Sequence, residues 1–169
     1  FPDVELLAEA PLDEVLHYWT GLGYYARARN LHKTAKIIIS QYRGKFPSSF
    51  DQIISLPGIG RSTAGAVLSL SYNKRLPILD GNVKRVVARH AMIAGWPGNK
   101  AVHDALWEHA TILTPRDNVA IYNQAMMDIG SSLCTRSKPN CLACPVADDC
   151  QARLAQQQHA FPGKKKSSA

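Results

Sequence analysis

Four cysteines lie within one short stretch near the end of this chain of 169 residues, spaced Cys-x6-Cys-x2-Cys-x5-Cys. They are Cys134, Cys141, Cys144 and Cys150. Four thiolates in one loop can wrap a single tetrahedral metal ion or a four-iron cubane, so this part of the chain must close on itself. The uneven outer spacings favour a 4Fe–4S cluster over zinc, which more often takes two close pairs of ligands. Four free thiols would be unusual at this density.

The formal charge of +7 is distributed unevenly along the chain. Residues 1–20 hold five acidic side chains and no Lys or Arg, whereas residues 21–100 hold 13 basic side chains and only two acidic ones. This basic stretch favours an anionic partner, although charge alone does not separate nucleic acid from a membrane surface. No apolar run approaches the roughly 18 residues that a membrane span needs. The polar tail, residues 163–169, is expected to be disordered.

Apolar residues recur at helical spacing through most of the chain, as in the set Leu12, Val15, Leu16 and Trp19. Ser49 and Gln52 have the spacing of a capping box, which predicts a short helix after Ser49. Residues 37–39 are the only candidate strand, and their flanks are helical. The sequence therefore predicts an all-α fold. The three tryptophans, Trp19, Trp96 and Trp107, are expected in the core.

A glycine-rich turn, Leu-Pro-Gly-Ile-Gly at residues 56–60, lies between two predicted helices. Gly58 and Gly60 would allow positive φ and the close approach of another backbone. The following helix would offer its N-terminal N–H groups to a phosphate, with contacts from Arg61, Ser62 and Thr63. The alternative is a tight interhelical turn without a ligand. The basic stretch around it favours a phosphate clamp.

Asp80 is one of the two acidic residues in the basic stretch and precedes a predicted helix. An N-cap is the simplest interpretation. A carboxylate beside a phosphate clamp would also stabilise a positive charge that develops on a nucleotide sugar.

The segment after residue 20 places Tyr24 and Tyr25 beside Arg27 and Arg29. Tyr24 would insert into a base stack while the arginines hold phosphates, or Tyr25 would lie in the core with both arginines solvated. Farther along the chain, the neighbouring Asn123 and Gln124 would present an amide to a pocket or simply be solvated.

Three of these features together resemble the helix–hairpin–helix DNA glycosylases related to endonuclease III. They are the turn at residues 56–60, an Asp placed 18 residues after Ser62, and the cysteine loop. The motifs at residues 21–25, 79–86 and 123–128 are similar to those of the adenine-specific (MutY-type) members. The resemblance covers nearly the whole chain, from about residue 1 to residue 163.

The resemblance implies a fold built of a six-helix barrel module and a cluster-bearing helical part with a C-terminal iron–sulfur loop. It places the start of a helical region at residues 1–20 and the helix–hairpin–helix module at residues 21–133. The 4Fe–4S cluster loop would occupy residues 134–150. A helix remnant and the disordered basic tail would follow at residues 151–169.

The resemblance also implies an activity, the removal of adenine mispaired with 8-oxoguanine or guanine in double-stranded DNA. The adenine would be flipped out of the duplex, and its bond to the sugar would break through an oxocarbenium-like state. Asp80 would stabilise that cation, Asn82 would orient Asp80 or its water, and Ser62 and Gln124 would line the base pocket. Tyr24 would intercalate. The implied contacts with the DNA backbone come from Arg27, Gly58, Gly60, Arg61, Ser62, Thr63, Arg136 and Lys138.

Position 62 separates two subclasses of these enzymes. Bifunctional members carry a Lys here, whose amine attacks C1′ and leads to strand cleavage. Ser62 therefore predicts a monofunctional glycosylase. The glutamate that serves the family as general acid and its Nudix-like C-terminal domain have no counterpart in these 169 residues, so we expect the chain alone to be weak or inactive.

Other expectations follow from the same resemblance: a monomer, in a bacterial cytoplasm and associated with the nucleoid. Two alternatives stay open at this point. One is an endonuclease III-type glycosylase/lyase that acts on oxidised pyrimidines. The other is a non-catalytic helix–hairpin–helix module that binds DNA and uses the cluster for structure or redox sensing.

Overall fold

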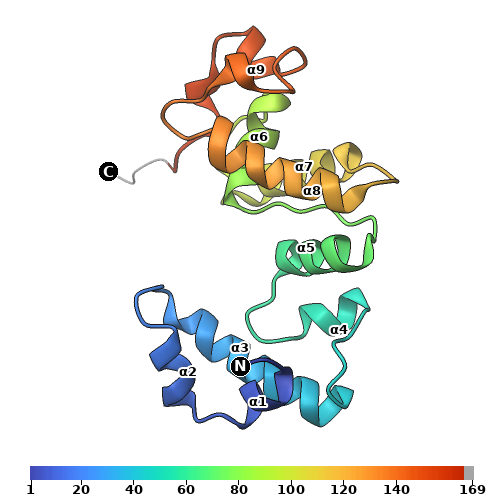
Figure 1. Ribbon diagram of the computed structural model, residues 1–169. Coiled ribbons are helices and arrows are strands. Elements are labelled where there is room, and N and C mark those ends of the chain that lie inside the picture. The colour runs from blue at the N-terminus through green and yellow to red at the C-terminus, as the bar shows by residue number, and fades with distance from the viewer. Residues whose placement is uncertain (166–169) are drawn as a thin grey trace. The chain divides into compact units, whose positions relative to one another are not determined.

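The computed structural model describes residues 1–165, and within them it contains only helices and loops (Figure 1). The prediction of an all-α fold is confirmed, and residues 37–39 lie inside a helix. The chain divides into two compact units, Phe1–Ala64 and the part from Gly65 onward. The boundaries expected from the sequence at residues 20, 133 and 150 stay predictions. Residues 166–169, the last part of the expected tail, lie outside the described residues.

The first unit is built on one long helix. Its helices are α1 (Val4–Glu9), α2 (Leu12–Tyr18), α3 (Tyr25–Tyr42), α4 (Phe50–Ile54) and the start of α5 (Arg61–Tyr72). Helices α1 and α2 both pack on α3, whose inward stripe of Ala28, Ala35 and Ile38 is almost completely buried. The predicted helix start after Ser49 is confirmed, because the Ser49 side chain accepts a hydrogen bond from the Gln52 N–H. The Gln52 side chain accepts from the Ser49 hydroxyl, at 2.8 Å, in place of the backbone N–H of a full capping box.

The second unit is organised around α6. Its elements are α6 (Gly81–His90), α7 (Lys100–Leu113), α8 (Val119–Asp128), the π-helical turn η1 (Ile129–Leu133), the 3-10 turn η2 (Cys141–Ala143), α9 (Gln151–Leu154) and the 3-10 turn η3 (Gln158–Ala160). Helix α6 contacts α7, α8, η1 and α9. The inner face of α6 is buried and is formed by Val83, Val86 and Val87. This hydrophobic packing fixes the N-terminal end of the helix.

The tryptophans divide between core and surface. Trp107 is buried and Trp19 is half-buried, but Trp96 is 41% exposed, so the prediction of Trp96 in the core is wrong. Trp96 lies in the loop between α6 and α7, where its ring covers Gly98. A Cβ atom added to Gly98 would come within 2.3 Å of that ring. The indole thus packs on backbone rather than among core side chains.

None of the helices in residues 1–165 is both long enough and apolar enough to cross a membrane. The expectation of disorder is wrong for residues 163–165, the part of the tail that the structure describes. The Gly163 N–H donates a hydrogen bond to the Gly95 carbonyl, at 3.0 Å, and the Lys165 amine lies over the Trp96 ring.

Candidate functional site

The site residues expected from the sequence fall in both units. The first unit holds the expected wedge and phosphate clamp, formed by Tyr24, Arg27, Gly58, Gly60, Arg61, Ser62 and Thr63. The second holds the expected catalytic and cluster residues, namely Asp80, Asn82, Gln124, Arg136, Lys138 and the four cysteines.

An exposed apolar tip, residues 21–24, joins α2 to α3. Gly21 and Gly23 have positive φ, and so does Tyr24 at +51°, where a side chain other than glycine costs about 1 kcal/mol or more. Tyr24 is 82% exposed and Leu22 is 61% exposed. The Trp19 indole N–H donates to the Gly23 carbonyl at 2.9 Å and closes the turn. The backbone of this turn therefore keeps the apolar side chains of Leu22 and Tyr24 exposed to solvent, although burial would be more favourable.

Arg27 supports this tip from α3. Its guanidinium lies 5.3 Å from the centre of the Trp19 ring and 5.5 Å from that of the Tyr24 ring, distances at which a cation attracts an aromatic face. A positive charge thus lies next to the exposed tyrosine. The sequence analysis missed Leu22, for which the one available signal was its position between two glycines.

The glycine turn joins α4 to α5, and its two glycines serve different purposes. Gly58 has φ of +75°, and a Cβ atom there would lie 2.5 Å from the Asn30 side-chain nitrogen. Gly60 lacks positive φ, so the expectation is wrong for this residue, but a Cβ atom there would meet nothing within 4 Å. Gly58 is required by the fold, whereas Gly60 leaves open space at the N-terminal end of α5, where backbone N–H groups attract anions.

The side chains at the start of α5 differ in exposure. Arg61 and Thr63 are exposed, and Ser62 is half-buried. This is the arrangement that a phosphate clamp needs, with a cation and a hydroxyl at a helix N-terminus.

Asp80 caps α6, because its Oδ1 accepts a hydrogen bond from the Val83 N–H at 2.8 Å. Ile78 and Leu79 before it and Val83 after it are all at most 3% exposed, whereas Asp80 itself is exposed. The buried neighbours anchor the backbone on both sides, and the capping bond fixes the side chain. The cap therefore holds a carboxylate on the surface in one orientation.

Asn82 belongs to a hydrogen-bond network that runs toward the cysteine loop. Its Oδ1 accepts a hydrogen bond from Arg85 at 2.9 Å, and Arg85 also donates to the carbonyl oxygens of Gly130 and Cys134. A Cβ atom on Gly130 would lie 2.7 Å from the Asn82 Cβ, so only glycine lets η1 approach α6 this closely. Arg85, which the sequence analysis did not single out, connects the start of α6 to the first cysteine.

The two neighbouring amides on α8 have different surroundings. Asn123 is fully buried and donates hydrogen bonds to the Ser69 hydroxyl and to the Leu76 carbonyl. Gln124 is exposed, and its amide donates to Asp128 at 3.0 Å on the same helix. Asn123 is therefore a packing residue, and Gln124 is the one that can reach a ligand.

The four cysteines line one cavity together with apolar residues of α6 and η1, and none of the four is in a disulfide. Among residues 1–165, no three His, Cys, Asp or Glu side chains are grouped closely enough to hold a single metal ion. Four thiols that share one cavity and form no disulfide fit an iron–sulfur cluster, in which each iron takes one thiolate.

Arg89 places a buried positive charge against this cavity. Its side chain is 2% exposed, and it donates to the Cys134 sulfur at 3.3 Å and to the Thr135 carbonyl at 2.7 Å. It also donates to the carbonyl oxygens of Arg136, Gln158 and Phe161. A buried guanidinium needs a negative partner, and the thiolates of an iron–sulfur cluster supply one.

The cysteines themselves are compatible with this cofactor. Burial raises the pKa of the Cys144 thiol, so bonding to iron is what would hold this sulfur as a thiolate at neutral pH. The sequence analysis missed Arg89, although its spacing of four residues from Arg85 places both on one side of α6. Both arginines link α6 to the cysteine loop.

Arg136 and Lys138 lie in the segment between the first two cysteines, and both are exposed. Arg89 holds the carbonyl of Arg136, and the Thr135 hydroxyl donates to the carbonyl of Lys138 at 2.7 Å. The backbone beneath both cations is therefore fixed, as a surface that contacts phosphates requires.

Comparison with known families agrees with this geometry. Residues 1–111 match the HhH-GPD superfamily of base excision DNA repair proteins, and residues 134–150 match the iron–sulfur binding domain of endonuclease III. The chain therefore belongs to the HhH-GPD superfamily. The expected fold and the expected iron–sulfur cofactor are both confirmed.

Several similar curated proteins are adenine DNA glycosylases. One from Buchnera aphidicola (subspecies Acyrthosiphon pisum) is 48% identical over 97% of this chain and 47% of its own length. The human protein is 37% identical over 94% of this chain and 29% of its own length. The chain thus spans about half the length of the bacterial relative.

Solved structures show the same fold. A thermostable thymine-DNA glycosylase superposes with a TM-score of 0.79 at 29% identity, over 92% of this chain and 71% of that one. A non-covalent complex of endonuclease III with DNA superposes with a TM-score of 0.76 at 24% identity, over 94% of this chain and 72% of that one.

Proposed function

We propose that this chain forms the glycosylase part of a monofunctional base excision repair enzyme, which removes adenine mispaired with 8-oxoguanine or guanine in DNA. The observation that carries the proposal is Asp80, a carboxylate fixed on the surface at the N-terminal end of α6. The similarity to adenine DNA glycosylases over 97% of the chain supports the choice of base.

Asp80 acts on the sugar in this proposal. Breakage of the glycosidic bond sends the electron pair to adenine, which takes up a proton, and leaves positive charge on C1′ and the ring oxygen. Only Oδ1 is engaged by the capping bond, and Oδ2 faces the cation. Water then adds to C1′ and releases one proton, which balances the proton that adenine takes up. The products are free adenine and an intact strand with an abasic site.

Other residues orient Asp80 and hold the base in this proposal. Asn82 is held by Arg85 and orients Asp80 or the attacking water. Gln124 of the second unit contacts the flipped adenine, and Ser62 of the first unit is the other residue that we propose for base contact. Tyr24 fills the gap that the flipped base leaves, since stacking on an aromatic ring offsets part of the few kcal/mol that unstacking costs.

Phosphate contacts come from three places: the start of α5, Arg27 in the first unit, and the cysteine loop with Arg136 and Lys138. The iron–sulfur cluster supplies a structural centre that keeps this loop folded. The partner in this proposal is double-stranded DNA carrying the mismatch, bound by a monomer in the bacterial cytoplasm near the nucleoid.

The test is release of adenine under single-turnover conditions from a duplex with adenine opposite 8-oxoguanine. Because the chain spans about half of its relative, it is placed in a chimera, where it replaces the matching segment of the Buchnera glycosylase. The chimera should release adenine, and Asp80→Asn should slow release by about 100-fold or more, as for other preorganised charges. Asn also caps helices, so this variant should keep its fold.

A chimera that folds and binds its cluster but releases no adenine would contradict the proposal. So would an Asp80→Asn variant with unchanged release, which would favour the non-catalytic DNA-binding module.

A further inference from the structure

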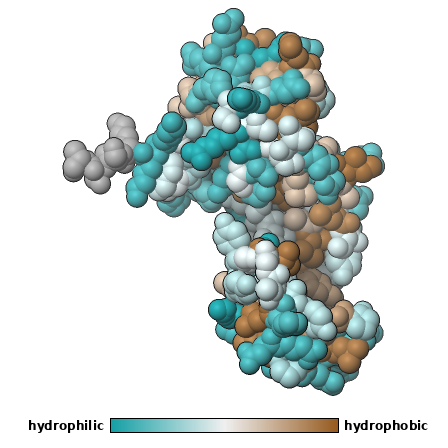
Figure 2. All heavy atoms as spheres, turned by 60° about the vertical axis from the view of Figure 1, so that its left-hand side comes forward, coloured by the Kyte–Doolittle hydropathy of each residue, from teal (hydrophilic) through white to brown (hydrophobic). Residues whose placement is uncertain are grey.

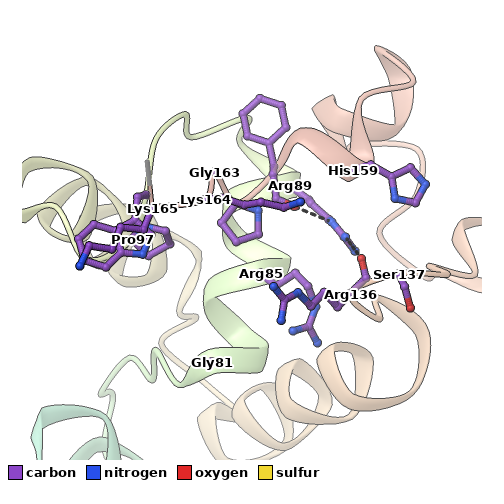
Figure 3. Close-up of a pocket in the computed structure, with 13 residues that line it drawn as sticks. Gly81, Arg85, Arg89, Pro97, Arg136, Ser137, His159, Gly163, Lys164 and Lys165 are labelled. Atoms are coloured by element: carbon purple, nitrogen blue, oxygen red, sulfur yellow. Dashed lines mark hydrogen bonds between the residues drawn. The ribbon is translucent and has the colours of Figure 1, made fainter. Parts of the chain in front are cut away.

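A basic groove with a volume of about 760 Å³ lies within the second unit. Its wall is formed by four segments: α6, the loop after it, the start of the cysteine loop and the C-terminal segment (Figure 3). The lining residues are Gly81, Arg85, Arg89, Trp96, Pro97, Arg136, Ser137, His159, Phe161, Pro162, Gly163, Lys164 and Lys165.

All the Lys, Arg, Asp and Glu side chains that line the groove are positively charged. Five of its residues are Lys or Arg, and none is Asp or Glu. Arg89 is buried and committed to the cysteine loop, whereas Arg136, Lys164 and Lys165 are exposed. The surface near the C-terminal end is correspondingly hydrophilic in Figure 2. A groove with several cations and no acid attracts a polyanion strongly.

A tight crossing of two backbones holds the lysines in this wall. The Gly163 N–H donates to the Gly95 carbonyl at 3.0 Å. A Cβ atom on Gly163 would lie 2.7 Å from that same carbonyl group, so a larger residue does not fit. Beyond the crossing, the Lys165 amine lies 5.5 Å from the centre of the Trp96 ring. Lys165 is therefore held beside Trp96, and Lys164 is held in the wall between it and the crossing.

We propose that this groove binds the phosphodiester backbone of the DNA, which extends the contact well beyond the reacting nucleotide. The groove begins at Gly81, directly after Asp80, so a strand that leaves the reacting sugar can continue into it (Figure 3). This inference rests on the proposed function for its ligand. It assigns Lys164 and Lys165 to DNA binding, together with Arg136 at the opposite wall.

The first test removes charge. Lys164→Gln with Lys165→Gln, in the iron–sulfur-loaded chain, is compared by fluorescence anisotropy with wild type on an undamaged duplex over a range of salt concentrations. Each phosphate contact contributes about −0.9 to the slope of log K against log salt. The double variant should therefore bind more weakly, and its slope should become shallower by about 1.8. Lys100→Gln is the control, because Lys100 is an exposed lysine of α7 that pairs with Asp104 and does not line the groove.

The second test keeps the charge and disturbs its placement. Gly163→Ala should prevent the crossing with Gly95 and release both lysines from the wall. Affinity should fall toward that of the double glutamine variant, while the absorbance of the cluster stays unchanged. Loss of binding should be equal on undamaged and mismatched duplexes, because backbone contacts carry no base information.

The inference would be overturned if the double glutamine variant had the affinity and the salt dependence of the wild type. It would also be overturned if the wild-type chain bound no duplex at all. Equal losses in Lys100→Gln would also overturn it, since they would show a general charge effect. Failure of the chimera to release adenine counts against the proposed function alone. The inference that the groove binds DNA is still supported in that case if the double glutamine variant and Gly163→Ala weaken duplex binding as stated.

Discussion

Tyr24 is a residue at which backbone strain accompanies an exposed aromatic side chain. Tyr24 has the left-handed backbone conformation and is the most exposed tyrosine of the first unit. Packing does not explain it, since its ring contacts mainly the Arg27 guanidinium. An exposed aromatic side chain on a strained backbone is what a residue that inserts into DNA requires.

Tyr24→Ala should weaken binding of a mismatched duplex about tenfold, since stacking a base on an aromatic ring contributes about 1–3 kcal/mol. Tyr24→Phe should bind like the wild type because it keeps the ring. Tyr18→Ala is a matched control, since Tyr18 is 69% exposed in the same unit. Titration by fluorescence anisotropy measures all three, and equal losses in Tyr24→Ala and Tyr18→Ala would argue against a wedge.

In the proposed function, Ser62 determines the type of chemistry. A hydroxyl cannot form a Schiff base with C1′, so borohydride should trap no covalent complex between the chimera and DNA, and the strand should stay intact until alkali is added. Ser62→Lys supplies the missing amine and serves as the positive control. Robust trapping by the Ser62 protein would reject the monofunctional assignment.

Helices and turns were the features best predicted from the sequence. The helix start after Ser49 and the helix that begins at residue 61 follow from local rules of hydrogen bonding and apolar spacing. Trp96 was misplaced because composition favours burial of tryptophan, whereas a glycine two residues later gives the ring a backbone surface to cover. Arg89 was missed because its partners are carbonyl oxygens and a sulfur from distant segments.

The glycine turn between α4 and α5 allows its structural and binding roles to be separated. Gly58→Ala should lower stability by about 1–3 kcal/mol, because positive φ and the contact with Asn30 both exclude a side chain. Gly60→Ala should leave the melting temperature unchanged and weaken DNA binding, because its Cβ atom would stand where a phosphate approaches. Thermal melts and anisotropy on the two variants provide the comparison. Gly60→Ala with wild-type affinity would show that the turn only connects helices.

At the scale of the whole molecule, Arg89 connects the cluster site to the rest of the second unit. It contacts both a cysteine sulfur and the backbone of the segments around it. The sequence alone predicted the four ligands, since their spacing is local. It did not predict the buried cation that links α6, the cysteine loop and the C-terminal segment. Such long-range contacts arise only when the chain is folded.

Removal of iron should therefore loosen the segment after α8. Without thiolates, Arg89 keeps its backbone carbonyl acceptors but loses the negative charge that balances its own, which destabilises this segment. Trypsin should then cut at Arg136 and Arg153, while Lys33 and Lys36 within α3 of the first unit stay protected. Mass spectrometry of fragments with and without iron chelation measures the effect. Identical cleavage patterns would mean that the cluster does not stabilise this segment.

The central claim concerns which base is released. The most direct measurement compares single-turnover release by the chimera from two duplexes, one with adenine opposite 8-oxoguanine and one with an oxidised pyrimidine. The account predicts release of adenine alone, with an intact strand and a strong dependence on Asp80. Release of the oxidised pyrimidine with strand cleavage, and retention of adenine, would contradict it and assign the chain an endonuclease III-type activity.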